Sequence, residues 1–240
     1  MITKPSSIKE AIILAGGLGT RLRSVVSDVP KPMALLNDKP FLVYLLDYVA
    51  SYGIEHVILS VGYKYEVIRD YFGEQYKSMK LSYAIEKEPL GTGGAIRYAL
   101  SFVKKDCAFL LNGDSFFNVN LHDLGEFFMA YQADISLTVK KMRNVERYGT
   151  VEMDVCRVVN FLPKTPLKFG FINGGVYAIS KQIFERFPVG RKFSFESEFL
   201  ATYLNELRIC AMKSNEYFID IGVPEDYEKA REELPGLVSS

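Results

Sequence analysis

The sequence of 240 residues has no tryptophan, only two histidines and no excess of charge of either sign. Lys and Arg together number 29, and so do Asp and Glu, so the formal net charge is zero. A strongly basic surface for nucleic acid or for a membrane is therefore not expected, and we predict neither as a partner. No apolar run approaches the roughly 20 residues that cross a bilayer. The segment MITKPSSIKE at the start also lacks the apolar middle of a signal peptide.

Cysteine is scarce as well. Cys107, Cys156 and Cys210 are odd in number, far apart and set among apolar neighbours. That pattern is typical of buried, reduced thiols, so we expect a cytoplasmic protein. With so few histidines and such scattered cysteines, a zinc site is not expected.

The composition that remains is that of a globular protein, with 48% hydrophobic and 24% charged residues. The length fits one large domain or two small ones. No linker, repeat or low-complexity tract divides the chain, so we expect residues 1–240 to form a single domain.

Short apolar runs typical of buried strands alternate with helical spacing of apolar residues along the first half of the chain. This order predicts an α/β fold: a mixed, mainly parallel sheet flanked by helices, which binds ligands at the carboxyl ends of its strands. The expected strands are 11–15, 56–61, 81–85, 107–111, 135–139, 149–153, 157–161, 174–179, 209–212 and 217–221. The expected helices are 40–52, 66–72, 94–103, 121–133, 196–207 and 225–234.

A glycine-rich segment, LAGGLGTRL at 14–22, follows the first expected strand. Glycines let successive backbone N–H groups approach an anion, and Arg21 adds a bidentate fork for phosphate. Lys31 is a further cation between two prolines. The alternative is a tight turn with solvated charges. The segment is not a Walker loop, and the third glycine of a dinucleotide-binding motif would fall at Leu22, which disfavours a nicotinamide oxidoreductase.

Two aspartates stand out from the strand pattern. Asp114 ends a buried strand, where a carboxylate is either a Mg²⁺ ligand or the cap of the helix that starts near Leu121. Asp220 lies inside an expected strand, which is an unusual place for a charge.

Taken together, LAGGLGTRL and the VPKPM that follows it resemble the signature of the sugar-1-phosphate nucleotidyltransferases. The resemblance continues through EKEPLGTGGAI (86–96), LLNGD (110–114), INGGVY (172–177) and FIDIGVPEDY (218–227). It extends over about residues 9–231. It implies transfer of a nucleotidyl group from a nucleoside triphosphate to a sugar 1-phosphate, with release of pyrophosphate and with Mg²⁺ as cofactor.

The resemblance also implies roles for single residues. Arg21 would grip the β- and γ-phosphates, Lys31 would lie by the α-phosphate, and Asp114 and Asp220 would share one Mg²⁺. Glu86, before the turn that binds the base, faces either the base or the solvent. The residues implied in nucleotide binding, within a part of about 9–140, are Leu14, Ala15, Gly16, Gly17, Gly19, Thr20, Arg21, Glu86, Gly91, Thr92 and Gly93.

The sugar side is implied in the part of about 141–231. Pro163 departs from the family, because a glutamate that contacts sugar hydroxyls is common there. Glu152 or Glu196 could replace that glutamate; the alternatives are a charge on the surface of a strand for Glu152 and a charge at a helix N-terminus for Glu196. The residues implied around the sugar and its phosphate are Asn112, Tyr148, Gly149, Lys164, Asn173, Gly174 and Lys192.

Within the family, the run GGLGTRLRSVVSDVPKPMA, with Ser24, is most similar to the bacterial D-glycero-D-manno-heptose 1-phosphate guanylyltransferases. This implies GTP and a heptose 1-phosphate as substrates, and a GDP-heptose for surface glycans as product. Mannose or glucose 1-phosphate, with GTP, UTP, CTP or dTTP, remains an alternative. A silent subunit that binds nucleotide sugars is another, although Arg21, Lys31, Asp114 and Asp220 are all intact. The sequence leaves the anomer and a homo-oligomeric state open.

Overall fold

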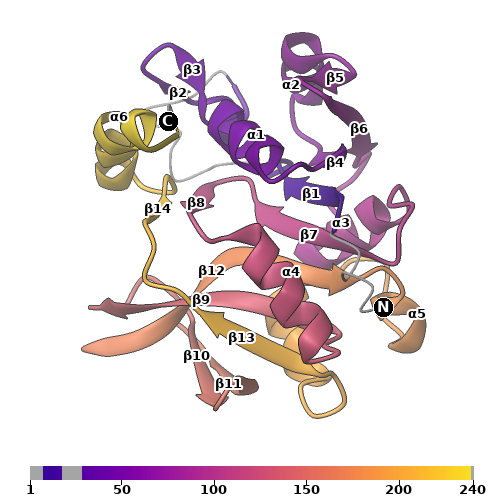
Figure 1. Ribbon diagram of the computed structural model, residues 1–240, viewed down its shortest axis with the longest axis vertical. Helices are drawn as coiled ribbons and strands as arrows, with labels where there is room; N and C mark the ends of the chain where they lie inside the picture. The colour runs from indigo at the N-terminus through magenta and orange to yellow at the C-terminus, as the bar shows by residue number, and fades with distance from the viewer. Residues whose placement is uncertain (1–7, 18–28, 239–240) are drawn as a thin grey trace, which may run out of the picture.

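The computed structural model describes residues 8–17 and 29–238, which form a large sheet with helices packed against it (Figure 1). A mixed sheet flanked by helices was predicted, and it is confirmed. The sheet is not mainly parallel, because antiparallel pairings join most strands of the second half of the chain. The strands of this sheet are β1 (Glu10–Leu14), β4 (His56–Val61), β5 (Gln75–Tyr76), β6 (Met79–Ile85), β7 (Cys107–Asn112), β9 (Ile135–Arg143), β10 (Thr150–Asp154), β11 (Arg157–Leu162), β12 (Phe169–Ser180) and β13 (Ile209–Lys213). Their spatial order is β10-β11-β13-β9-β12-β7-β1-β4-β6-β5.

The run β7-β1-β4-β6 is parallel, because a helix connects each strand of it to the next along the chain. These connections are α1 (Phe41–Ser51), α2 (Tyr65–Phe72) and α3 (Gly91–Leu100). β12 is antiparallel to both β7 and β9, whereas β13 and β9 are parallel. The remaining elements are η2 (Lys31–Met33), α4 (Leu121–Ala130), α5 (Ile183–Arg186), η3 (Phe195–Leu200) and α6 (Pro224–Val238), with the strand pairs β2 (Leu35–Leu36) with β3 (Lys39–Pro40) and β8 (Ser115–Phe117) with β14 (Phe218–Asp220).

Buried side chains fill both faces of the sheet. In β1, Ala11 and Ile13 belong to one hydrophobic cluster and Ile12 belongs to the other, as the twofold alternation of a strand requires. α1, α4 and α6 supply residues to the first cluster, whereas α3, α5 and η3 supply residues to the second. Because both faces are covered, the edge at the carboxyl ends of the parallel strands is where ligands can reach the sheet.

α3 begins at Gly91, not at Gly94 as the sequence predicted, and it ends at Leu100, before the predicted Val103. Three glycines in the first turn are poor helix formers, which is why the sequence placed the start after them. The structure shows what offsets that cost. The N–H of Gly93 donates to the carbonyl of Phe193 at 3.0 Å, and a Cβ at Gly93 would overlap the ring of Phe193.

Two segments of the second half also differ from the prediction. The expected helix 196–207 is shorter than predicted: it begins as the π-helix η3, in which the N–H of Phe199 donates to the carbonyl of Ser194, and its helical residues end at 202. The expected strand 174–179 is the centre of the longer β12, whose register shifts between Asn173 and Tyr177. Gly175, at φ +74°, supplies the backbone conformation of this bulge. Over the described ranges, no helix is both long and apolar enough to span a bilayer.

Candidate active site

A cleft of about 1430 Å³ opens at the carboxyl ends of the parallel strands. Gly16 and Gly17 follow β1 on one wall, and Asn112 ends β7 at its floor. Gly149, before β10, and Glu196, in η3, belong to the opposite wall. The cleft therefore lies between the first and second halves of the chain, where the sequence predicted nucleotide and sugar.

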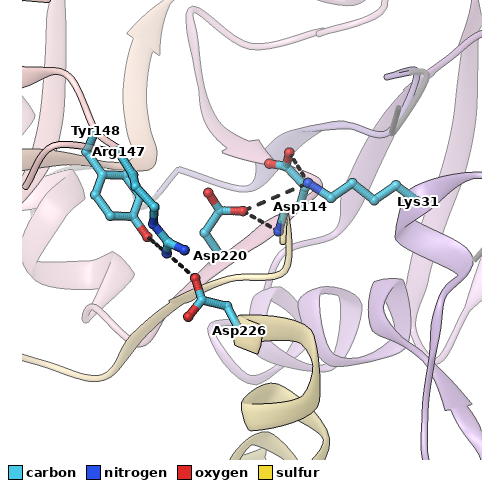
Figure 2. Close-up of polar contacts among 7 residues, drawn as sticks. Lys31, Asp114, Arg147, Tyr148, Asp220 and Asp226 are labelled. Carbon is cyan, nitrogen blue, oxygen red and sulfur yellow. Dashed lines mark hydrogen bonds and ion pairs between the residues drawn. The ribbon is translucent and has the colours of Figure 1, made fainter. Parts of the chain in front are cut away.

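A lysine lies between two aspartates in this cleft (Figure 2). Lys31 Nζ is 2.8 Å from Asp114 Oδ2 and 3.9 Å from Asp220 Oδ1. The Lys31 side chain is only 10% exposed, while those of Asp114 and Asp220 are 47% and 33% exposed. The ammonium is thus enclosed and the carboxylates remain accessible to a ligand.

Backbone pairing holds the two aspartates together. β8 and β14 are antiparallel, with Ser115 opposite Asp220, so residues 105 positions apart in sequence are neighbours. The N–H of Ile221 donates to the carbonyl of Asp114 at 2.9 Å, and that of Gly222 donates to Asp220 Oδ1 at 2.7 Å. The carboxylate of Asp220 is therefore fixed in direction by its own turn.

The capping alternative for Asp114 is excluded. The cap of α4 is Asn120, whose side chain accepts hydrogen bonds from the N–H groups of His122 and Asp123. In the described part of the chain, no group of three or more His, Cys, Asp or Glu side chains could hold a metal ion. Two carboxylates, completed by water and substrate oxygens, match the oxygen ligands and small protein share that Mg²⁺ prefers.

The glycine loop approaches the next two strands closely. The N–H of Ala15 donates to the carbonyl of Ser60 at 2.7 Å, and Ala15 is buried behind the wall of the cleft. A Cβ at Gly16 would lie 3.1 Å from Glu86 Oε1 and 3.2 Å from the backbone nitrogen of Gly62, so little more than glycine fits. Gly19, Thr20 and Arg21, together with Ser24, lie outside the described residues.

Glu86 lines the cleft beside Gly16. Its Oε2 accepts a hydrogen bond from the N–H of Leu90 at 3.1 Å. Burial raises the pKa of its carboxyl, and the Leu90 N–H partly opposes this shift. The side chain therefore lies on the cleft wall, and its contact with the base stays a prediction.

The turn at the start of α3 has a packing role. Gly91 and Thr92 line the cleft, but Gly93 does not. A Cβ at Gly91, where φ is +71°, would lie 2.5 Å from the carbonyl oxygen of Phe193. Thr92 Oγ1 accepts a hydrogen bond from the N–H of Phe195 at 2.9 Å. This turn therefore anchors the segment 193–195 as well as facing the cleft.

Most of the residues predicted around the sugar lie together. The cleft lining includes Asn112, Tyr148, Gly149, Lys164 and Asn173, but it does not include Gly174. Lys192 was predicted as a second phosphate cation, but it is exposed and away from the cleft lining. The carbonyl groups on either side of it, of Arg191 and Phe193, accept hydrogen bonds from α3 and fix this segment against the helix.

Arg147 is a cleft residue that the sequence analysis missed. Its guanidinium pairs with Asp226 in the first turn of α6 and contacts the Tyr148 hydroxyl at 3.2 Å (Figure 2). The hydrogen bond to Asp226 raises the pKa of Arg147, and burial raises that of Tyr148. This pair connects the loop before β10 to α6. Its position directly before Tyr148-Gly149 is the sequence signal that could have identified it.

These features are those of an enzyme that handles phosphorylated substrates: a sheet with a cleft at the carboxyl ends of its parallel strands, and a lysine held between two aspartates in that cleft. The family model for nucleotidyl transferases matches residues 10–235, and the chain belongs to this family.

Relatives from bacteria narrow the comparison. The chain is 51% identical over 219 residues to the D-glycero-alpha-D-manno-heptose 1-phosphate guanylyltransferase of Campylobacter jejuni, covering 91% of this chain and 96% of that protein. It is 48% identical over 225 residues to the enzyme of the same name from Aneurinibacillus thermoaerophilus, covering 94% and 98%. The crystal structure of HddC from Yersinia pseudotuberculosis superposes with a TM-score of 0.82 at 38% identity, covering 94% of this chain and 99% of that one. A second HddC structure is complexed with GMP-PN and has a TM-score of 0.81.

Proposed function

We propose that this protein is a D-glycero-D-manno-heptose 1-phosphate guanylyltransferase, which transfers the guanylyl group of GTP to the sugar phosphate and releases pyrophosphate. The observation that carries the proposal is the Lys31 ammonium held between Asp114 and Asp220 at the floor of a cleft large enough for both substrates. The two relatives of that name, each matched over nearly its whole length, support the choice of substrates.

The chemistry needs little from a general base, because the attacking sugar phosphate oxygen is already an anion. The barrier lies in bringing two anions together in line and in stabilising the charge that develops at the α-phosphorus. Lys31 is suited to that task because Asp114 and Asp220 hold its ammonium group in position before the substrates bind. Arg21 would hold the departing β- and γ-phosphates.

Asp114 and Asp220 would hold the Mg²⁺ ion. When bound, the ion supplies a Lewis acid for the phosphate oxygens. The partly exposed carboxylates line the cleft beside Lys31, so the lysine and the ion would share the negative charge of the triphosphate. Lys31 also keeps the two acids close together without the ion, since it lies within 4.0 Å of both.

The two substrates would occupy opposite walls, the nucleotide in the part of about 9–140 and the sugar in the part of about 141–231. Gly16, Gly17, Gly91 and Thr92 would border the nucleotide, with Glu86 facing guanine, whose ring N–H and amino group are donors that a carboxylate accepts. The residues we place around the sugar phosphate are Asn112, Gly149, Lys164 and Asn173. We also propose a cytoplasmic location, which the three free thiols support.

The experiment is a matrix of GTP, UTP, CTP and dTTP against heptose, mannose and glucose 1-phosphates, read as pyrophosphate release. The highest kcat/KM should be for GTP with the heptose 1-phosphate of manno configuration. Discrimination against mannose 1-phosphate should be about tenfold, because one extra hydroxyl contributes about 1 kcal/mol. A higher kcat/KM for mannose 1-phosphate or for another triphosphate would overturn the sugar or the base assignment, respectively. No pyrophosphate from any pair would overturn the enzymatic function itself.

A further inference from the structure

Three side chains of the sugar wall form a closed hydrogen-bond network. Asn173 Nδ2 donates to the Tyr177 hydroxyl at 2.7 Å and to Glu196 Oε1 at 2.8 Å. The Tyr177 hydroxyl also contacts Glu196 Oε1, at 2.9 Å. Asn173 and Tyr177 flank the bulge of β12, whereas Glu196 comes from η3. Asn173 and Glu196 both line the cleft, and Tyr177 is buried behind them.

Counting donors shows which member of the network can still bind a ligand. Both amide hydrogens of Asn173 are used, and its Oδ1 accepts from the N–H of Gly175 at 3.1 Å, which also fixes the orientation of the amide. The single hydroxyl hydrogen of Tyr177 is used on Glu196. Burial and the neighbouring carboxylate raise the pKa of Tyr177, so its hydroxyl stays a donor.

Glu196 is left with acceptor capacity. Oε1 receives two hydrogen bonds, whereas Oε2 receives none from the described residues. The carboxylate belongs to an exposed residue on the cleft wall, and a carboxylate offers about four lone-pair sites for donors. One oxygen is therefore anchored and the other is available, which is the arrangement expected of a group that reads hydroxyl donors of a ligand.

The backbone that carries Glu196 is held from both sides. The N–H of Phe195 donates to Thr92 Oγ1 at 2.9 Å, and the rings of Phe195 and Phe199 stack at 6.0 Å. The Ser194 side chain caps the turn by accepting from the N–H of Ser197. Such support fixes the position of the carboxylate before a sugar arrives, which lowers the entropy that binding has to overcome.

We propose that Glu196 determines the sugar specificity of this enzyme: through Oε2 it accepts hydrogen bonds from hydroxyl groups of the sugar 1-phosphate, in place of a carboxylate at Pro163. Asn173 and Tyr177 are positioning residues that aim Glu196. Glu152, the other carboxylate with the right chemistry, is bonded to Asn160 on the β10–β11 hairpin and is not on the cleft wall. This inference rests on the proposed function, since it needs a sugar phosphate in the cleft.

The test is steady-state kinetics of Glu196→Gln with the heptose 1-phosphate varied at saturating GTP, and with GTP varied. The glutamine can still accept from Asn173 and Tyr177 through Oε1, but it presents an amide donor to the cleft. We expect kcat/KM for the sugar phosphate to fall by about 10- to 100-fold, which is the range for one hydrogen bond to a charged group. KM for GTP and the melting temperature should stay unchanged. Glu152→Gln is the matched control and should behave as the wild type.

A panel of monodeoxy heptose 1-phosphates distinguishes contact with the sugar from a structural role, because only a direct contact makes the loss of kcat/KM depend on which hydroxyl is removed. Removing the hydroxyl that Glu196 contacts should lower kcat/KM in the wild type and have no further effect in Glu196→Gln. If Glu196→Gln does not fold, Tyr177→Phe serves instead. This variant lacks only the hydroxyl oxygen and its hydrogen, so Glu196 Oε1 loses one of its two hydrogen bonds and the carboxylate is held less firmly. That variant should raise the sugar KM about threefold to tenfold without changing the GTP KM.

The outcomes separate this inference from the proposed function. An active wild type with an unchanged sugar kcat/KM in Glu196→Gln overturns the role of Glu196 and leaves the enzyme assignment intact. Equal losses for every deoxy sugar in both proteins would also overturn it. A wild type inactive on every sugar phosphate overturns the proposed function instead.

Discussion

Lys31 and Asp114 are 83 residues apart in the chain, yet the Nζ of one lies 2.8 Å from the Oδ2 of the other. η2, in which Lys31 lies between Pro30 and Pro32, brings the lysine to the end of β7, where the chain turns into β8. The contact orients the lysine toward the floor of the cleft. A cation placed there before reaction costs no reorganisation when negative charge develops on the phosphates.

Lys31→Ala should therefore lower kcat by about 100-fold or more and raise the GTP KM much less, because its charge matters most in the transition state. Pre-steady-state and steady-state kinetics with GTP and the sugar phosphate measure both constants. Lys9→Ala is the control, since Lys9 bonds the carbonyl of Gly53 away from the cleft. An unchanged kcat in folded Lys31→Ala would contradict the assignment.

Asp114→Asn and Asp220→Asn should each reduce turnover by about 1,000-fold or more, since a catalytic metal contributes several kcal/mol. Both variants should stay folded, because the backbone bonds of β8 and β14 do not involve the carboxylates. A higher Mg²⁺ concentration should restore part of the activity of the two variants. Chelation of the metal should abolish the activity of the wild type. Asp123→Asn, at the start of α4 and away from the cleft, is the matched control. Near-normal turnover in either variant would remove that residue from the metal site.

The sequence was sufficient for the parallel strands β1, β4, β6 and β7 and for the edge that carries the site, because buried parallel strands are short apolar runs and their carboxyl ends meet. It did not predict β8, the short strand that pairs with β14 beside Asp220. It placed Asp114 and Asp220 as candidates from their positions on such runs. It could not show that Lys31 lies between them, since that contact depends on how η2, β8 and β14 pack.

Tertiary packing also explains the two helices that differ from the prediction. Local propensity places the start of α3 after its glycines, but the ring of Phe193 needs a residue without a side chain at Gly93. In η3 the N–H of Phe199 bonds to the carbonyl five residues before it, whereas an α-helix bonds four residues back. The spacing of apolar residues in the sequence does not distinguish these two patterns. The sequence also could not choose between Glu152 and Glu196, because which carboxylate reaches the cleft depends on how β10 and η3 pack in the folded chain.

Binding of GTP should depend on pH through Glu86. Burial raises the pKa of this carboxyl, and the proposed contact with guanine needs the ionised form. Affinity should therefore fall as the pH drops through this raised pKa, which happens at a higher pH than for an exposed glutamate. The stability changes with the opposite sign: the contribution of Glu86 is fully present below its unfolded pKa and is lost as the pH rises through its folded pKa.

Calorimetric titration with GTP and denaturant unfolding, across about pH 4 to pH 8, measure the two trends. Glu86→Gln removes the titrating group. Protonation of GTP affects both proteins alike, so the difference between their pH profiles reports the protonation of Glu86. The variant should bind GTP more weakly at neutral pH and should lose the extra pH dependence. Parallel pH profiles of wild type and variant would show that Glu86 does not contact the base in its charged form.

Glu10 should be a stability residue with no part in catalysis. It is 4% exposed, and its carboxylate accepts from the N–H groups of Lys104 and Lys105 and contacts His56 Nδ1 at 2.7 Å. Glu10→Gln turns an amide donor toward backbone donors, which should lower the free energy of unfolding by about 1–3 kcal/mol. Urea unfolding measures this, with Glu55→Gln as the control on an exposed side chain. Kinetic constants that change while stability does not would contradict this reading.

A substitution at Gly93, in the first turn of α3, shows whether this glycine serves packing or ligand binding. A methyl group at Gly93 would overlap the Phe193 ring, so Gly93→Ala should lower the free energy of unfolding by about 1–3 kcal/mol, the usual cost of overpacking. Phe193 precedes η3, so displacing it should also disturb Glu196 and raise the sugar KM. Gly236→Ala, where no atom lies within 4 Å of the added Cβ, should be neutral or slightly stabilising in α6. Urea unfolding and the two KM values decide the matter: a Gly93→Ala protein as stable as the wild type, with a raised GTP KM alone, would mean that the glycine serves the nucleotide and not the packing of Phe193.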